Sequence, residues 1–353
     1  MSGNIFGKVF QVATFGESHG VGLGAVVDGM PSGIEICESD IQKELDRRRP
    51  GQSKVTTARN EGDKVEILSG VFEGKTTGTP IALLIRNADQ HSKDYSNIKD
   101  IFRPGHADYT YFSKYGIRDY RGGGRSSGRE TVGRVAAGAL AKKMLEHFGI
   151  SVIGFTKSVG KVRGEKFDPG FIEQNIVRAA DPAQAENMQK EITDAAAMHD
   201  SVGGVVECRI YNLPAGLGNP CFDKLDAELA KAMMSVGGVK GVEIGDGFEV
   251  ASRRGSENND AMRDSGFVTN HAGGILGGIS NGNTVIIRAA VKPTPSISQL
   301  QHSVDLNNQN TDVEIHGRHD PCLVPRIVPV AEAMCALVIA DFLRLSGVAK
   351  DKI

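Results

Sequence analysis

The stretch from Tyr120 to Leu145 places a glycine run, two serines and several arginines directly before a predicted helix. Gly122 to Gly124 allow the backbone to turn tightly and to approach a ligand without an intervening Cβ atom. A helix that begins near Glu130 directs unpaired N–H groups and the positive end of its dipole toward Arg125, Ser126, Ser127 and Arg129. This combination predicts a pocket for a phosphate or a carboxylate, and the alternative is a solvated loop that caps a surface helix.

Three other segments hold side chains that can carry a proton near neutral pH. His19 lies in a glycine-flanked turn between two predicted strands, and His106 follows a Pro-Gly turn that also presents Arg103. Asp320 lies close to Arg318, which favours its ionised form and a role as a base. The structural alternatives are a turn histidine, a loop-capping histidine and a helix N-cap aspartate.

Two further segments add positive charge. The run from Arg47 to Lys54 contains Arg48 and follows a predicted helix, so it is interpreted as a second anion-binding loop rather than a solvated face. The segment Lys292-Pro293-Thr294-Pro295-Ser296 offers an ammonium group and two hydroxyls on a backbone that two prolines stiffen. A proline-rich connector is the alternative for this segment.

The composition limits the classes of function. The 353 residues include 41 Lys and Arg against 43 Asp and Glu, so the net charge of −2 points to neither nucleic acid nor a membrane as a partner. Five scattered cysteines without a C-x-x-C pair argue against a disulfide framework or a metal site and predict reduced core thiols. No signal peptide and no apolar run of about 20 residues is recognised, so a soluble cytoplasmic protein is expected.

The apolar pattern predicts alternating strands and helices of the α+β class. Small residues in the helix at 130–148 predict that it is buried on more than one side, and polar residues at 258–269 predict a mobile segment. The Gly-Arg segments before two long helices predict an internal pseudo-repeat. Strands are expected at 8–14, 23–28, 64–72, 79–86, 150–162, 205–211 and 284–291, and helices at 39–48, 130–148, 171–179, 183–198, 222–234 and 328–344.

Seven motifs together resemble the chorismate synthase family. The resemblance spans nearly the whole chain, and its specificity comes from the order and spacing of the motifs rather than from any one of them. They are GESHG at 16–20, RRRPGQSK at 47–54, FRPGHAD at 102–108, GGGRSSGRETVGRVAAGA at 122–139, VKGVEIGDGF at 239–248, KPTPSI at 292–297 and GRHDPC at 317–322.

The resemblance implies a lyase that converts 5-enolpyruvylshikimate 3-phosphate to chorismate and phosphate in the shikimate pathway of aromatic amino acid biosynthesis. This 1,4-elimination requires reduced FMN without a net redox change. The family fold implies a β-α-β sandwich with helices between antiparallel sheets, one catalytic domain over residues 1–353, and a homotetramer. Because no G-x-G-x-x-G follows a predicted strand, reduced FMN is expected from an external flavin reductase.

The resemblance also assigns roles to residues. His19 would protonate or hydrogen-bond the reduced flavin, His106 would assist the departing phosphate, and Asp320 would help to remove the C6 proton. Lys54 stands where the family often has arginine, which keeps the charge but removes a bidentate hydrogen-bonding group. Gly237-Gly238 stands where the family often has Asn-Ala, which removes any side-chain contact at this position. The substrate (or NADP) would meet Arg48, Lys54, Arg103 and Arg129, and FMN would lie on Arg125, Ser126, Ser127, Gly237, Gly238, Gly277, the segment from Lys292 to Ser296, and Arg318.

Two other classes of function compete with this interpretation. A nucleotide- or nucleic-acid-binding protein would use the same glycine-rich basic loops, but the near-neutral charge and the scarcity of aromatics disfavour it. An ordinary phosphate-handling transferase would be active under air without reduced flavin, whereas the lyase would not.

Overall fold

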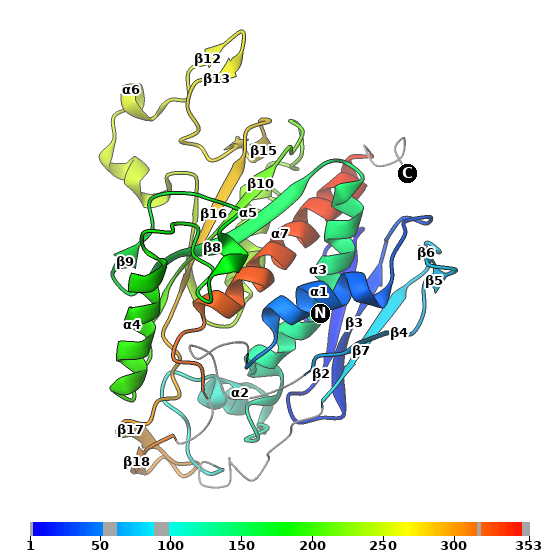
Figure 1. Ribbon diagram of the computed structural model, residues 1–353. Coiled ribbons are helices and arrows are strands. Elements are labelled where there is room, and N and C mark those ends of the chain that lie inside the picture. The colour runs from blue at the N-terminus through cyan, green and yellow to red at the C-terminus, as the bar shows by residue number, and fades with distance from the viewer. Residues whose placement is uncertain (1–2, 52–61, 88–98, 316–318, 348–353) are drawn as a thin grey trace.

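The computed structural model describes residues 3–51, 62–87, 99–315 and 319–347. Within them, two five-stranded antiparallel sheets enclose a layer of helices, as Figure 1 shows. The strand order is β1-β2-β3-β7-β4 in the first sheet and β11-β16-β10-β8-β9 in the second. The predicted α+β sandwich with helices between antiparallel sheets is therefore confirmed.

The described elements have the following bounds. The first sheet contains β1 (Ile5–Phe6), β2 (Gln11–Gly16), β3 (Gly22–Asp28), β4 (Val65–Ile67) and β7 (Ile81–Arg86). The second contains β8 (Ser151–Val159), β9 (Val162–Arg163), β10 (Gly204–Tyr211), β11 (Val239–Ile244) and β16 (Val285–Val291). The helices are α1 (Glu38–Arg48), α2 (Asp108–Tyr115), α3 (Thr131–Glu146), α4 (Ala185–Ala197), α5 (Leu225–Met234), α6 (Gly255–Asn258) and α7 (Val324–Ser346). Four small hairpins pair β5 (Val71–Phe72) with β6 (Lys75–Thr76), β12 (Met262–Arg263) with β13 (Gly266–Phe267), β14 (Ile275–Leu276) with β15 (Ile279–Ser280), and β17 (Gln301–Val304) with β18 (Asn310–Val313).

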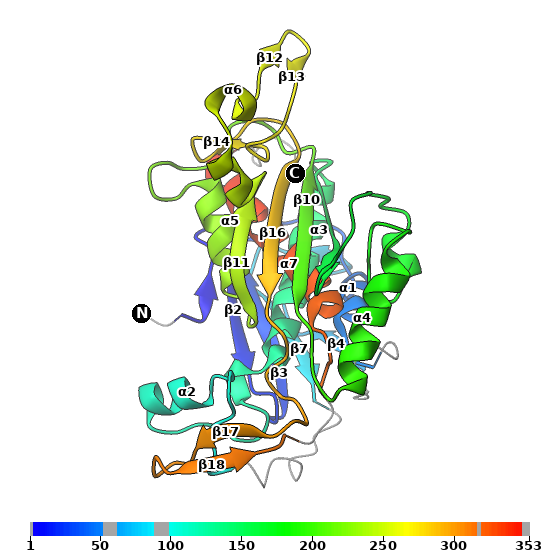
Figure 2. The same ribbon diagram turned by 90° about the vertical axis from the view of Figure 1, so that its left-hand side faces the viewer.

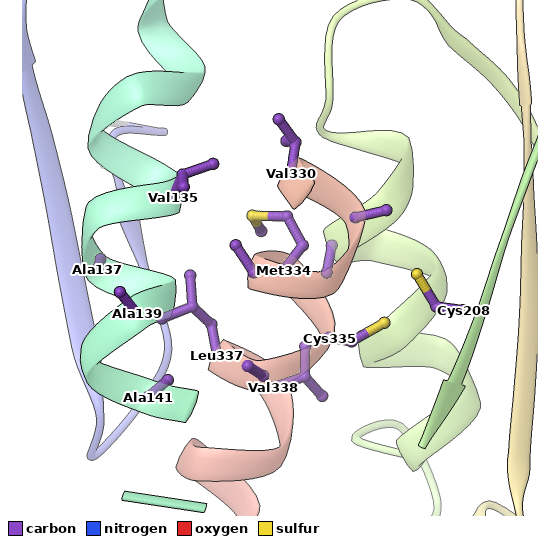
Figure 3. Packing of buried hydrophobic residues seen from close by; sticks show 14 of the residues in the cluster. Val135, Ala137, Ala139, Ala141, Cys208, Val330, Met334, Cys335, Leu337 and Val338 are labelled. Atoms are coloured by element: carbon purple, nitrogen blue, oxygen red, sulfur yellow. The ribbon is translucent and has the colours of Figure 1, made fainter. Parts of the chain in front are cut away.

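The two halves of the chain repeat the same order of elements. The first runs β2-β3-α1-β4-β7-α3 and the second β8-β10-α5-β11-β16-α7, with the corresponding strand orders β2-β3-β7-β4 and β8-β10-β16-β11. The long helices α3 and α7 lie side by side and run in the same direction (Figure 3). This topology supports the predicted internal repeat and brings the N-terminal ends of both helices to the same end of the molecule.

The contact between α3 and α7 depends on the absence of a side chain. A Cβ atom on Gly138 would lie 2.3 Å from the Cβ of Ala333, and one on Gly133 would lie 2.7 Å from the carbonyl oxygen of Gly24 on β3. The helix therefore approaches both a neighbouring helix and the first sheet more closely than alanine would permit. Figure 3 shows Val135, Val330, Met334 and Leu337 filling the space beside this contact.

A buried group of charged side chains also holds the helices of the central layer together. Glu332 on α7 is almost fully buried, accepts a hydrogen bond from the backbone N–H of Gly154 at 2.7 Å, and pairs with Arg47 of α1 and Lys142 of α3. Burial opposes ionisation of Glu332, but Lys142 and Arg47 outweigh it and lower the pKa of the carboxyl group. One carboxylate thus joins three helices and β8.

The start of α7 contains an internal proline, and a side chain from another segment replaces the hydrogen bond that this proline removes. Pro329 has no N–H, so the carbonyl of Pro325 four residues earlier lacks its helical partner, and the Arg178 guanidinium donates to this oxygen at 2.9 Å. Arg178 comes from the segment at 171–179, for which a helix was predicted. That prediction is wrong: only the 3-10 turn Ile172–Gln174 forms, and Arg178 has a φ of +53°.

Other differences from the predicted elements have local causes. The strands predicted at 64–72 and 150–162 are each divided, by turns at Gly70 (φ +80°) and Gly160 (φ +52°). The segment at 258–269, predicted to be mobile, contains the β12–β13 hairpin, which projects from the body of the molecule in Figure 2. Strand β11, helix α2 and the β17–β18 hairpin were not predicted.

The cysteines divide into two groups. Cys208, Cys322 and Cys335 are buried free thiols, as predicted, whereas Cys37 and Cys221 are exposed, so the prediction of core thiols is wrong for these two. Within the described ranges, no helix has the length and apolar character needed to cross a membrane.

We predict that Gly138→Ala lowers the free energy of unfolding by about 1–3 kcal/mol, measured by urea denaturation, because the new methyl group must displace Ala333. This loss exceeds the gain in helix propensity of roughly 0.5–1 kcal/mol. Gly255→Ala is the matched control, since a Cβ there meets no atom within 4 Å. Equal midpoints for the two variants would contradict the packing described for α3 and α7.

Candidate active site

A cavity of about 310 Å³ opens at the N-terminal ends of α3 and α7. Six separate segments of the chain contribute to its lining: the end of α1, the loop before α2, the loop before α3, the turn after α5, the segment after β16 and the start of α7 with the residues before it. The predicted site residues in the lining are Arg48, Arg103, His106, Ser126, Ser127, Arg129, Gly237, Gly238, Lys292, Thr294, Pro295, Ser296 and Asp320.

Positive charge dominates the cavity. Among the residues that the structure describes, five cationic side chains line it, against the carboxylate of Asp320. Because charge in a low-dielectric enclosure is costly unless paired, this excess favours a guest that carries several negative charges. The five cationic residues are Arg48, Arg103, Arg129, Lys292 and Arg326.

Two of these arginines share one buried carboxylate behind the cavity wall. Arg48 and Arg129 both pair with Asp63, at 3.3 Å and 2.5 Å respectively, and Arg48 also donates to the carbonyl oxygen of Gly128 at 2.6 Å. Burial, together with repulsion from Arg326, lowers the pKa of the Arg48 guanidinium to about 9 despite Asp63. An anion in the cavity would relieve this repulsion.

Asp320 is held between α7 and the segment after β16. It is 7% exposed, its carboxylate pairs with the Arg326 guanidinium, and its carbonyl oxygen accepts a hydrogen bond from Thr294 Oγ1 at 2.7 Å. Arg326 Nε lies 3.3 Å from the carbonyl oxygen of Arg48, to which it donates. Arg326 was not predicted as a site residue, because the helix was expected to begin only at 328, whereas α7 begins at Val324 and includes Arg326 in its first turn.

The loop before α2 carries a second group of charges. Arg103 donates from Nε and Nη2 to the two oxygens of Asp108, both at 2.8 Å. Burial lowers the pKa of His106 below its ordinary value; Arg103 acts in the same direction, and Asp108 opposes both. These effects together favour the neutral form of the imidazole. Asp108 was quoted only as the last residue of the motif FRPGHAD and Asp63 was not singled out, because no pattern in the sequence shows which arginine a carboxylate will pair with.

Two predicted residues lie near the cavity without lining it. His19 is 6% exposed and lies behind Gly122, where a Cβ atom would come within 3.0 Å of its Cδ2 and Nε2 atoms. Pro293 packs beside Gly203, whose Cβ would lie 3.1 Å from the proline Cδ. His19 thus lies beside the lining residue Gly122 in space, and Pro293 lies between the lining residues Lys292 and Thr294 in sequence.

Arg125 and Gly277, for which flavin contacts are predicted, lie outside the lining of this cavity. Arg125 donates to Thr14 Oγ1 at 2.7 Å and so fastens the glycine loop to β2 instead of lining the cavity. Gly277 forms the turn between β14 and β15 with a φ of +62°, beside the N-terminal end of α5, whereas the cavity is lined by the residues that follow the C-terminal end of that helix. Lys54 and Arg318 lie outside the described residues.

Comparison with known proteins shows the family to which the chain belongs. The family model described as chorismate synthase matches residues 10–344. The chain belongs to the chorismate synthase family. A chorismate synthase from Methanosarcina mazei is 56% identical over 356 residues, covering 98% of each chain, and one from Lachnospira eligens is 55% identical, covering 97% of this chain and 95% of the relative.

A solved chorismate synthase crystal structure has the same fold, with a TM-score of 0.77 and 32% identity over 98% of each chain. The family membership predicted from the seven motifs is therefore confirmed. The members of this family are enzymes, which makes the cavity at the two helix ends the candidate active site.

We predict that Arg48→Gln weakens binding of inorganic pyrophosphate at least about tenfold, because a charge-assisted hydrogen bond contributes roughly 1.5–3 kcal/mol. Binding is measured as the pyrophosphate-dependent rise of Tm. Arg163→Gln is the control, since that side chain is 58% exposed and outside the cavity lining. Equal weakening in both variants would contradict the assignment of the cavity as an anion site.

Proposed function

We propose that this chain converts 5-enolpyruvylshikimate 3-phosphate to chorismate and phosphate, as a carbon–oxygen lyase of the shikimate pathway. The observation that carries the proposal is one cavity that combines five cationic side chains with a buried aspartate and a histidine. The substrate has one phosphate and two carboxylates, which match several arginines, and its elimination needs groups that move protons.

The fit to the substrate follows from the positions of the arginines. Arg48 and Arg129 come from α1 and from the loop before α3, Arg103 from the loop before α2, and Arg326 from α7. Because they surround the cavity, they can meet anionic groups at different ends of one small molecule. Rigid, buried guanidiniums orient such groups with a small further loss of conformational freedom.

The cavity also has features that suit FMN. Val236, Leu323, Ile327 and Val330 form an apolar part of the lining, against which a flat ring system can pack. A Cβ at Gly237 would meet no atom within 4 Å, and Gly238 has a φ of +97°, so this turn leaves open space beside the lining. The hydroxyl and ammonium groups that would hold the cofactor belong to Ser126, Ser127, Lys292, Thr294 and Ser296. When bound, reduced FMN would supply transient electron density to the reaction without net oxidation.

The proton-handling groups are assigned from their positions. Asp320 faces the cavity with its carboxylate held by Arg326, which suits a base that removes the C6 proton. His106 lines the cavity and His19 lies behind Gly122, so both imidazoles can exchange protons at the site. Their division between the leaving phosphate and the flavin stays a prediction.

The remaining parts of the proposal concern the environment of the enzyme. Every named strand pair in the described residues is antiparallel, which fits an external flavin reductase rather than a built-in dinucleotide-binding domain.

Phe15 is 42% exposed on the face of the first sheet opposite to α3, and this uncovered apolar position suits a contact between subunits of a homotetramer. We place the enzyme in the cytoplasm.

Anaerobic assay of phosphate release tests this function directly. We expect release from 5-enolpyruvylshikimate 3-phosphate with chemically reduced FMN, and none with oxidised FMN. Release in air without flavin would favour a phosphate-handling transferase. Salt-sensitive retention on DNA with no effect of flavin would favour nucleic-acid binding.

We predict that Asp320→Asn lowers kcat by about 10²–10⁴-fold, the usual contribution of a general base, while FMN affinity measured by fluorescence quenching changes little. Asp312→Asn serves as the control because Asp312 lies on the exposed β17–β18 hairpin. Near-normal turnover in Asp320→Asn would remove this carboxylate from the mechanism.

A further inference from the structure

A buried aspartate holds both functional side chains of the loop before α2. Asp108 is the first residue of α2 and is 2% exposed. It accepts hydrogen bonds from Nε and Nη2 of Arg103 at 2.8 Å and from the backbone N–H of Arg103 at 3.2 Å, and its Oδ1 lies 2.9 Å from His106 Nδ1. Burial opposes its ionisation, but Arg103 and His106 outweigh burial and hold the pKa of Asp108 well below its usual range.

The position of the imidazole proton follows from what surrounds Nδ1. A carboxylate oxygen can only accept a hydrogen bond, and the Arg103 Nη2 group, 3.1 Å from Nδ1, can only donate. One of the two N–H groups of Nη2 donates to Asp108 Oδ1 at 2.8 Å, and the other could reach Nδ1 only over the longer distance of 3.1 Å, compared with 2.9 Å between Nδ1 and the Asp108 carboxylate. If Nδ1 carried a lone pair, that lone pair would face the charged oxygen at 2.9 Å. The proton therefore belongs on Nδ1, where it is donated to Asp108.

We propose that Asp108 is a positioning residue that keeps the His106 proton on Nδ1, so that Nε2 is the atom that exchanges protons in the cavity. The same carboxylate aims the Arg103 guanidinium, so one buried group aligns an anion-binding side chain with a proton carrier. The activity readout of this proposal rests on the proposed function, whereas the position of the proton does not.

The loop that carries these groups is itself fastened at several points. Arg118 lies 3.5 Å from Asp108 Oδ2 on the side away from His106, and donates to the carbonyl oxygen of Ile101 at 2.8 Å. The backbone N–H of Phe102 donates to Val304 on β17 at 3.1 Å. This support leaves the carboxylate little freedom to turn away from the imidazole.

The first test is a double-mutant cycle on kcat, using Asp108→Asn, His106→Gln and the combined variant. If Asp108 acts through His106, Asp108→Asn lowers kcat by at least about 30-fold in the wild-type background, within the usual range for a proton-transfer group, and by less than about 3-fold in the His106→Gln background. The loss of Arg103 alignment appears instead as a rise of KM in both backgrounds. Equal losses in both backgrounds would show a merely structural role and overturn the proposal.

A matched control comes from the surface. His302 and Asp312 form the same kind of contact, 2.7 Å between Nδ1 and Oδ1, on an exposed hairpin outside the cavity lining. Asp312→Asn is expected to leave kcat within about 2-fold of wild type. A large loss of kcat in Asp108→Asn would therefore be specific to this contact and not a general result of breaking a histidine–aspartate pair.

The second test reads the proton directly and needs neither turnover nor an Asp108 variant. Solid-state NMR of protein labelled with ¹⁵N-histidine distinguishes the two neutral tautomers, and the signal missing from His106→Gln identifies this residue. We expect His106 to be protonated on Nδ1 above its pKa; protonation on Nε2 would overturn the proposal. An Nδ1 proton without phosphate release would separate a failure of the proposed function from a failure of this inference.

The same spectra give a pH dependence. The charged groups that face His106 are Arg103, Asp108 and Lys292, of which only Asp108 raises its pKa. Asp108→Asn should therefore move the midpoint of the His106 titration to lower pH, and an unchanged midpoint would contradict the close contact with Asp108.

Discussion

The contact between α3 and α7 is the constraint on which the rest of the structure depends. Gly138 and Ala333 approach so closely that the helices run beside each other from their first turns, with the N-terminal end of each at the cavity. Loops that are distant in sequence precede or flank these two ends, so the helix packing brings Arg129 and Asp320 to one place. Each half of the chain contributes one of these helices, because the two halves repeat the same order of elements.

Two kinds of charge burial serve different ends in this layer. Around Glu332 the charges compensate each other, since Arg47 and Lys142 lie against two carboxylates, those of Glu332 and Glu44, and Glu332 also accepts a backbone hydrogen bond. One residue further along α1, Arg48 shares Asp63 with a second arginine, and its positive charge is left incompletely balanced. The balanced charges around Glu332 stabilise the helical layer, whereas the unbalanced positive charge of Arg48 favours binding of an anion in the cavity.

Much of the fold and site could be predicted because local patterns carry them. Glycine runs, turn residues and apolar spacing located most helices and strands, and the small residues of α3 indicated a helix buried on several sides. Interactions between distant segments could not be read this way. The segment at 171–179 has helical composition, yet it bends so that Arg178 can satisfy the carbonyl left open by Pro329. Asp63 likewise has a role only beside Arg48 and Arg129, which tertiary structure brings to it, and Arg125 is turned toward β2 by Thr14. Asp108 pairs with Arg103 only because the turn between them brings the two side chains together.

The central claim is that one cavity at the paired helix ends seats both an anionic substrate and the flavin. A crystal structure with 5-enolpyruvylshikimate 3-phosphate and FMN bound is the most direct measurement of this claim. The account predicts substrate anions within hydrogen-bonding distance of Arg48, Arg103 and Arg129, with the flavin ring between the substrate and the Val236–Gly238 turn. Electron density for either molecule at another surface, with this cavity filled by solvent, would contradict it.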